Sequence, residues 1–434
     1  MNELQLSSAD LTGGIIFANF LYNNRMKILA VETSCDDTCV SIVEATPIKG
    51  SKVPSFRILS NITSSQIKIH KHYGGVVPTL AKRAHENNLV TVLKKSLGEA
   101  GVLKNKKSRI KNQNDKSKFK ILESIFDKEP VLMEKFLPYI TKIEKPGIDI
   151  IAVTYGPGLE PALWAGVNFA RALSFWWSIP LLGVDHMEGH ISANFLPKIG
   201  KMTNDQLPII NFPALCLAVS GGHTQLLIVK NINKYELIGE TVDDAAGEGF
   251  DKVARLLGLS FPGGPQIARL AATGDARAFN FARPMINSKN YNFSFSGLKT
   301  SVLYGIKKLV GKKLDQTLEK NDFAKLSKQT KADIAASFQQ AAVDVLISKT
   351  IRAARDYRVK TVMLAGGVAA NKKLRDQLGS KIKSELYAVN YQLLTAELAT
   401  DNAAMIAAAA YFRKNRARID KWKTLTADGN LKIS

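Results

Sequence analysis

One local pattern occurs twice in the sequence, and it restricts the fold more than any other feature. Residues 27–31 form an apolar run, 32–38 are polar, and 40–44 form a second apolar run. Residues 214–229 repeat this order, with a polar turn at 220–224. Each occurrence predicts two strands joined by a turn. Because each pair is followed by segments that alternate between strand and helix signals, we expect an α/β protein with two similar lobes.

The later segments complete both lobes and suggest where they begin and end. We expect an N-terminal extension at 1–25, a first lobe at 26–205, a second lobe at 206–400 across a central cleft, and a C-terminal helix and tail at 401–434 that packs back towards the first lobe. Strands are predicted at 148–154, 181–184 and 360–364, and helices at 74–100, 159–178, 243–258, 264–273 and 333–359.

Four turns follow apolar strands and contain glycine or small hydroxyl residues: 32–38, 156–158, 220–224 and 366–371. Such turns let backbone N–H groups approach a phosphate. None fits the GxxxxGK[ST] or GxGxxG pattern in its required context. The alternative is that each is simply a tight turn.

A histidine pair provides the clearest ligand signal. His186 and His190 are four residues apart, so a helix places both imidazoles on one face, close enough to hold one metal ion. Asp185 is placed to cap that helix, with Glu188 completing a capping box. The alternative is a pair of solvated helix histidines.

Asp401 begins an alanine-rich helix far along the chain. Together with the two histidines it would complete a set of two imidazoles and one carboxylate, which suits iron(II) or zinc with positions left open for a substrate. The alternative is that Asp401 only caps its helix.

The composition indicates a polyanionic partner. The 434 residues carry a formal net charge of +22, which favours nucleic acid. Part of this charge lies at 101–120, where eight Lys or Arg residues stand against one Asp. We expect 101–120 to be a solvated or disordered loop within a basic, poorly periodic insert at 101–147, and residues 104–120 to be dispensable for folding but not for nucleic-acid affinity.

Cysteine and apolar content restrict the compartment. Cys35, Cys39 and Cys216 form no disulfide or zinc pattern, which indicates a reducing compartment. No stretch approaches the ~20 apolar residues of a membrane span. A cytoplasmic location fits best, since residues 1–25 carry one Arg and two acidic residues and so are a poor mitochondrial transit peptide.

Several longer motifs together resemble one family. The sequence resembles the tRNA adenosine threonylcarbamoyltransferase family, bacterial TsaD type, in motifs that run in order along most of the chain. They are Glu32–Thr38, Gly74–Pro78 with Arg83 and His85, Gly156–Leu159, His186–His190, Val219–Thr224, Gly249–Ala254, Pro262–Pro265, Phe293–Lys299, Gly366–Asn371 and Thr400–Met405.

The resemblance implies the two-lobed, actin-like ATPase (ASKHA) fold and a divalent metal, iron(II) or zinc, held by His186, His190 and Asp401. By similarity, the threonylcarbamoyl-AMP donor contacts Ala218, Val219, Ser220, Gly221, Gly222, Asp251, Gly264 and Asn371. A carboxylate such as Asp251 is able to accept hydrogen bonds from both ribose hydroxyls.

The implied activity is transfer of the threonylcarbamoyl group to the exocyclic amine of the adenosine beside the anticodon in tRNA. A TsaB-like paralogue and a TsaE-like ATPase are the implied protein partners. Glu32, Asp36 and Asp37 are candidates for a general base, each with a structural role as the alternative. A metallopeptidase, and a nucleotide-dependent scaffold or kinase of the same fold, are the alternative functions.

Overall fold

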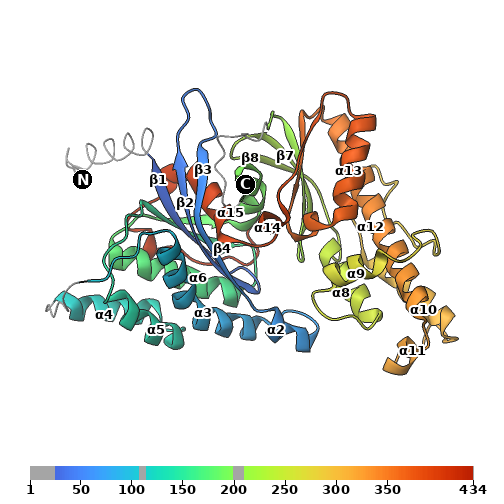
Figure 1. Cartoon of the computed structure of the whole chain (residues 1–434), viewed down its shortest axis with the longest axis horizontal. Helices are drawn as coiled ribbons and strands as arrows, with labels where there is room; N and C mark the ends of the chain where they lie inside the picture. Colours follow the sequence, from blue (N-terminus) through green and yellow to red (C-terminus); the bar gives the residue numbers. More distant parts are fainter. Residues whose placement is uncertain (1–24, 107–113, 199–209, 434) are drawn as a thin grey trace, which may run out of the picture. The chain divides into compact units, whose positions relative to one another are not determined.

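The computed structural model describes residues 25–106, 114–198 and 210–433 of the chain (Figure 1). The described residues divide into two compact units. The first contains those within 1–64, 82–207 and 402–431, and the second those within 65–81, 208–401 and 432–434. The expected extension at 1–25 lies outside the described residues except for Arg25.

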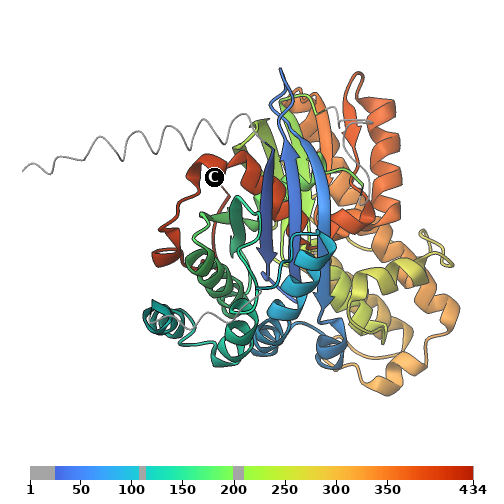
Figure 2. The same ribbon diagram turned by 60° about the vertical axis from the view of Figure 1, so that its left-hand side comes forward.

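The first unit is built on a five-stranded sheet with the order β3-β2-β1-β4-β5. β1 is antiparallel to β2 and parallel to β4, and β4 is parallel to β5. Figure 2 shows β1 to β3 side by side in blue. The predicted hairpin is present, with Glu32 opposite Cys39. The strands are β1 (Met26–Glu32), β2 (Asp37–Thr46), β3 (Ser55–Ser65), β4 (Ile150–Gly156) and β5 (Leu181–Asp185).

The second unit repeats this arrangement. Its sheet has the order β10-β9-β6-β7-β8, which is the first unit's order when read from β8. β6 is antiparallel to β7 and parallel to β9, and β9 is parallel to β10. The predicted α/β fold with duplicated halves is therefore confirmed. The strands are β6 (Ala214–Val219), β7 (Thr224–Asn231), β8 (Lys234–Glu240), β9 (Thr361–Ala365) and β10 (Asn390–Gln392).

Helices pack on both faces of the first sheet. One face, with Leu29, Val31 and Ile42, shares a core with α3 to α6. The alanine-rich α15 packs on β1, β2 and α7, because small side chains allow close approach. A Cβ on Gly189 of α7 would lie only 2.7 Å from Ile406 Cδ1 of α15. The helices are α3 (Pro78–Glu99), α4 (Asn114–Ile125), α5 (Pro130–Ile140), α6 (Glu160–Trp177), α7 (His186–Ser192) and α15 (Ala403–Phe412), with short 3-10 turns at Ala193–Phe195, Lys414–Arg416 and Lys421–Lys423.

In the second unit, α12 is the central core helix. Its apolar side chains share a core with Leu215, Leu217 and Val219 of β6 and with α8, α9 and α10. The helices are α2 (Ile67–His70), α8 (Ala246–Leu256), α9 (Gly263–Ala271), α10 (Ser296–Leu309), α11 (Lys320–Ala324), α12 (Lys328–Asp356), α13 (Lys372–Glu385) and α14 (Ala396–Ala399), with 3-10 turns at Lys71–Tyr73 and Gly367–Ala370. No helix in the described part of the chain is long and apolar enough to cross a membrane.

The expectation of a solvated or disordered loop at 101–120 is wrong from residue 114 onwards, and the surrounding insert contains two helices. Residues 114–125 form α4 and 130–140 form α5, while 107–113 lie outside the described residues. Leu122, Ile125 and Phe126 are buried in the core of the first unit. Their spacing of three and four residues is that of an apolar helix face, which the many lysines of this segment conceal.

This packing leads to a prediction for the part of the insert that follows residues 104–120, whose expected dispensability stays a prediction. Phe126 is 2% exposed, and its ring centroid lies 5.2 Å from that of Phe136. Phe126→Ala should therefore lower the free energy of unfolding by about 3–5 kcal/mol, measured by urea denaturation. Glu123→Ala on the exposed face of α4 is the control, with an expected change within about 0.5 kcal/mol. A loss below 1 kcal/mol for Phe126→Ala would mean that α4 packs loosely.

Candidate metal centre

The helix that carries the histidine pair begins as the sequence predicts. Asp185 ends β5 and caps α7, its Oδ1 accepting hydrogen bonds from the backbone N–H groups of Met187 (2.7 Å) and Glu188 (3.1 Å). Burial raises the pKa of the Asp185 carboxyl to about 6. Of the predicted capping box only the Asp185 half is present. The Glu188 carboxylate instead pairs with the guanidinium of Arg413, the residue just after α15. This partly buried ion pair joins α7 to the end of α15.

Both histidines are buried on one face of α7. His186 is 5% exposed and His190 is 0% exposed, and their ring centroids lie 4.6 Å apart. The alternative of two solvated helix histidines is therefore wrong. Two imidazoles so close together in a buried place are a typical pair of ligands for a transition metal.

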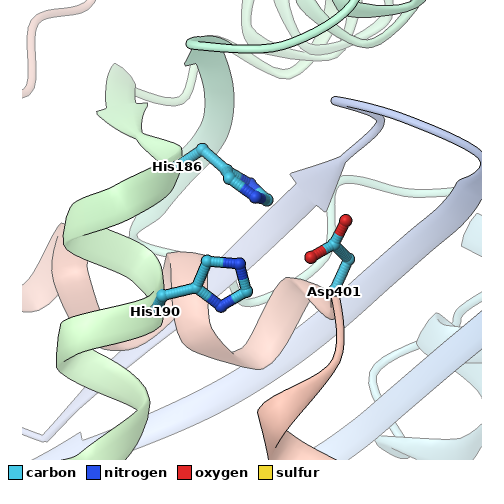
Figure 3. Close-up of side chains that lie close together, drawn as sticks. All are labelled: His186, His190 and Asp401. Carbon is cyan, nitrogen blue, oxygen red and sulfur yellow. The ribbon is translucent and has the colours of Figure 1, made fainter. Parts of the chain in front are cut away.

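Asp401 completes the group. The cap of α15 is Asn402, whose Oδ1 accepts a hydrogen bond of 3.0 Å from Met405 N–H, so the reading of Asp401 as the helix cap is wrong. One ligand atom from each of Asp401, His186 and His190 lies within 4.8 Å of the others. In Figure 3 the carboxylate and both imidazoles point towards one another.

The donor set fits a metal ion. Bonds of about 2.0–2.2 Å to nitrogen and oxygen place ligand atoms about 3–4 Å apart, so small side-chain movements bring these three into ligating positions. Two imidazoles with one carboxylate match the ligands that iron(II) and zinc accept, with positions left for a substrate. The group is compatible with one metal ion.

Glu32 orients one of the histidines. Its carboxylate is buried at the end of β1, and Oε2 lies 3.0 Å from His186 Nδ1 and accepts a hydrogen bond of 2.5 Å from Thr154 Oγ1. Oε1 accepts a hydrogen bond of 2.5 Å from Ser34 N–H. When Nδ1–H donates to this carboxylate, the Nε2 lone pair of His186 is left for a metal.

This role for Glu32 was not visible in the sequence. The sequence suggests a general base, which stays a prediction, and the structure adds a contact that places the carboxylate against His186 Nδ1. The two residues are 154 positions apart, and the only sequence signal is an acidic residue at the end of a strand, since β4 separates β1 from the strand β5 that leads into the histidine helix. Asp36 and Asp37 stay predictions as candidate bases.

The predicted donor-contacting residues of β6 and its turn lie at one end of the second sheet. Ala218 and Val219 are buried at the end of β6, and Ser220 N–H donates to His223 O (2.8 Å) to close the turn. A Cβ on Gly221 or Gly222 would meet no atom within 4 Å. Their backbone is therefore open to a ligand.

Two further segments approach the same turn. A Cβ on Gly247 of α8 would lie 2.5 Å from Ser220 O, and Gly366, with φ of +85°, approaches Val219 equally closely. The turns after β6 and β9 meet here because these strands are parallel neighbours. The structure thus brings the predicted turns at 220–224 and 366–371 together in this unit.

The remaining predicted residues lie on helices that border this end of the sheet. Asp251 is one turn beyond Gly247 on α8, and its Oδ1 accepts a hydrogen bond of 2.6 Å from Gly263 N–H at the start of α9. A Cβ on Gly264 would meet nothing within 4 Å. Asn371 caps α13 by accepting from Leu374 N–H (3.1 Å). Asn371 therefore has a structural role whether or not it contacts a ligand.

One predicted phosphate turn is already covered. Gly158 N–H donates to Gly429 O (3.2 Å), and a Cβ on Gly156 would collide with Asp428 O. The chain's own C-terminal residues occupy the space where a phosphate would lie. The expectation of a phosphate site at 156–158 is therefore wrong.

Comparison with known proteins places the chain in a family. A family model described as "tRNA N6-adenosine threonylcarbamoyltransferase", TsaD, matches residues 57–111 and 132–408. The chain belongs to the TsaD family. A relative of that name from Thermosipho africanus is 42% identical over 408 residues, which cover 94% of this chain and 100% of the relative. Another from Thermotoga neapolitana is 38% identical over 94% of this chain and 100% of the relative. A crystal structure of T. kodakarensis HypF has a TM-score of 0.48 and 13% identity, over 91% of this chain and 48% of that chain.

The TsaD match covers the candidate sites but not all of the basic insert. His186, His190 and Asp401 all lie within the second matched segment. Residues 112–131 lie between the two segments, and these residues contain the whole of α4. The helix α4 is thus an addition to the part of the chain that the family model describes.

Proposed function

We propose that this chain transfers the threonylcarbamoyl group from threonylcarbamoyl-AMP to N6 of the adenosine beside the anticodon in tRNA. The observation that carries the proposal is the match of the TsaD family model to most of the chain, together with relatives of that name aligned over their whole length. In the reaction, the amine nitrogen attacks the carbamoyl carbon. The bond from that carbon to the phosphate oxygen breaks, AMP leaves with the electron pair, and the amine loses a proton.

In this proposal His186, His190 and Asp401 hold one divalent metal, iron(II) with zinc as the alternative, and the transfer depends on it. When bound, such a metal supplies Lewis-acid polarisation of donor oxygens. Glu32 keeps the His186 ring oriented through its contact with Nδ1. These four residues are buried or half-buried, which limits the access of water to them.

The open glycine turn provides the donor contacts in this proposal. The backbone N–H groups of Gly221 and Gly222 are able to donate hydrogen bonds to negatively charged oxygens of the threonylcarbamoyl-AMP donor, because no side chain covers these glycines. Asp251 lies one helical turn beyond Gly247, which contacts this turn, and its carboxylate accepts hydrogen bonds from the ribose hydroxyls of the donor. Ala218, Val219, Ser220, Gly264 and Asn371 complete the proposed donor site.

Two observations disfavour a metallopeptidase. A zincin needs a glutamate directly after the first histidine to place a base beside the metal-bound water, and here Met187 holds that place and is 2% exposed. The next residue, Glu188, is paired with Arg413. A nucleotide-dependent scaffold or kinase of the same fold is the other alternative, and it would need no acyl transfer.

The proposal includes tRNA as the acceptor, a TsaB-like paralogue and a TsaE-like ATPase as protein partners, and a cytoplasmic location. The protein partners follow from family resemblance alone. Adding them to the purified chain should increase turnover, whereas a chain that works at full rate without them would contradict this part.

The experiment compares three reactions of the purified full-length chain. Threonylcarbamoyl-AMP with unmodified tRNA should yield modified adenosine and AMP, detected by nucleoside mass spectrometry. A peptide mixture should remain uncleaved, and ATP alone should be hydrolysed far more slowly than the transfer proceeds. Peptide cleavage or ATP hydrolysis without tRNA modification would favour an alternative function.

A further inference from the structure

Seven lysines of the first unit gather around one end of α6, and we call this group the lysine surface. All except Lys106 are exposed. It consists of Lys104, Lys106, Lys116, Lys118, Lys120, Lys142 and Lys145.

A short two-stranded contact brings part of the lysine surface together. Asn105 and Ile143 form an isolated antiparallel bridge. Lys106 N–H donates to Lys142 O (2.9 Å), and Glu144 N–H donates to Lys104 O (2.9 Å). Residues from the two ends of the insert are thereby held side by side.

Trp176 joins α4 to this contact. Its ring stacks on Phe119 of α4, with centroids 6.3 Å apart and planes at 8°. The ammonium groups of Lys118 and Lys106 lie 5.3 Å and 5.8 Å from the Trp176 ring centroid. Lys145 Nζ reaches the end of the same helix and donates to Ser178 O (3.1 Å). Trp176 therefore contacts lysines from two segments, and Lys145 from a third segment reaches the residue that follows the same helix.

The positive charge of the lysine surface is largely uncompensated. Segments 101–106, 114–126 and 142–148 hold these seven lysines against three acidic residues, Asp115, Glu123 and Glu144. Within the described residues, none of the seven lysines forms an ion pair of the kind seen between Lys82 and Glu129. Because a tryptophan ring attracts a cation without neutralising it, the ammonium charges remain available to an outside anion.

We propose that the lysine surface binds the phosphate backbone of the RNA substrate, outside the site of transfer. This inference rests on the proposed function, which makes tRNA the substrate. Lysine offers a flexible point charge rather than the planar fork of arginine, so it contacts phosphates without reading bases. The α4 part of the contact lies between the segments that match the TsaD model, whereas the other four lysines lie within those segments.

An acidic protein fits the lysine surface less well than RNA does. Protein interfaces bury an apolar or aromatic centre within a polar rim. Among the described residues from 101 to 178, no large apolar side chain is strongly exposed, and Trp176 itself is half-buried beneath Phe119 and two lysines. A surface with charge but no apolar centre favours a polyelectrolyte.

The test neutralises four exposed lysines of the surface that avoid the Trp176 contacts. Full-length chains with Lys104→Ala, Lys116→Ala, Lys120→Ala and Lys142→Ala combined are titrated with labelled unmodified tRNA at several salt concentrations. We expect the dissociation constant to rise about tenfold or more at moderate salt, and the slope of log K against log salt to become shallower by about 3. Thermal melting confirms that the variant is folded.

A matched control removes the same charge elsewhere. Lys289, Lys308, Lys313 and Lys383 are exposed lysines of the second unit, and changing all four to alanine should alter the affinity by less than about twofold. Equal binding by wild type and the first variant, or equal losses in both variants, would overturn the lysine surface as an RNA contact. Failure of the wild type to bind tRNA at all would instead contradict the proposed function.

Discussion

Asp401→Ala should abolish metal binding and threonylcarbamoyl transfer while the protein stays folded. The carboxylate is one of three groups whose ligand atoms lie within 4.8 Å of one another, and two imidazoles alone leave a divalent ion without its anionic ligand. Metal content by mass spectrometry should fall from one equivalent to near zero, and the transfer rate by about a thousandfold or more, which corresponds to about 4 kcal/mol of barrier. The fold should persist because Asn402, not Asp401, caps α15.

The protein with both Asp401→Ala and His186→Ala should have the same metal content and transfer rate as either single variant. The effects are not additive because each single change already removes the metal. His223→Ala is the control: this histidine belongs to the turn after β6, and the metal should be retained. An Asp401→Ala protein with a full equivalent of metal and normal turnover would remove Asp401 from the site.

Glu32→Gln should weaken metal binding by about 10–100-fold without removing any ligand. The carboxylate lies 3.0 Å from His186 Nδ1, and an amide in its place is neutral and no longer stabilises Nδ1–H. The ring then loses its preferred tautomer and some of its basicity at Nε2. The dissociation constant, measured by competition with a chelator, should rise, and excess metal should restore much of the transfer activity.

Rescue by excess metal separates positioning from general-base catalysis. If Glu32 were the base, transfer would stay low at saturating metal. Glu44→Gln is the matched control, because Glu44 is also a buried glutamate of this sheet but pairs with Arg25 (3.5 Å). It should leave the metal affinity unchanged.

The sequence predicts the elements that have strong apolar patterns. The strand at 214–219 is present with those bounds as β6, and the strand and helix around the histidine pair are correct. β8 was not predicted because, as an edge strand, it has mostly exposed and half-buried residues in no regular order and lacks an apolar run. The strands β3 and β10 and the helix α10 were also not predicted. The helix α4 was missed because its lysines conceal an apolar face.

The ligands of the candidate metal centre were predictable from the sequence, but the residues that hydrogen-bond to the ligands or fix their helix were not. Residue type and spacing are enough to select His186 and His190, and Asp401 is a candidate from its residue type and place before a helix, which family resemblance supports. The contact of Glu32 with His186 and the ion pair of Glu188 with Arg413 join residues 154 and 225 positions apart. Only the tertiary fold brings such partners together, since local patterns carry no record of distant contacts.

The most direct test of the account is a metal titration of the metal-free, full-length chain that follows bound metal and threonylcarbamoyl transfer in the same samples. Iron(II) and zinc are added separately, under anaerobic conditions, with threonylcarbamoyl-AMP and unmodified tRNA present. If His186, His190 and Asp401 hold the one metal on which transfer depends, activity rises in proportion to bound metal and saturates at one equivalent per chain. Full transfer activity in the metal-free protein would contradict the account. So would a metal titration that stays the same when His186, His190 or Asp401 is replaced by alanine.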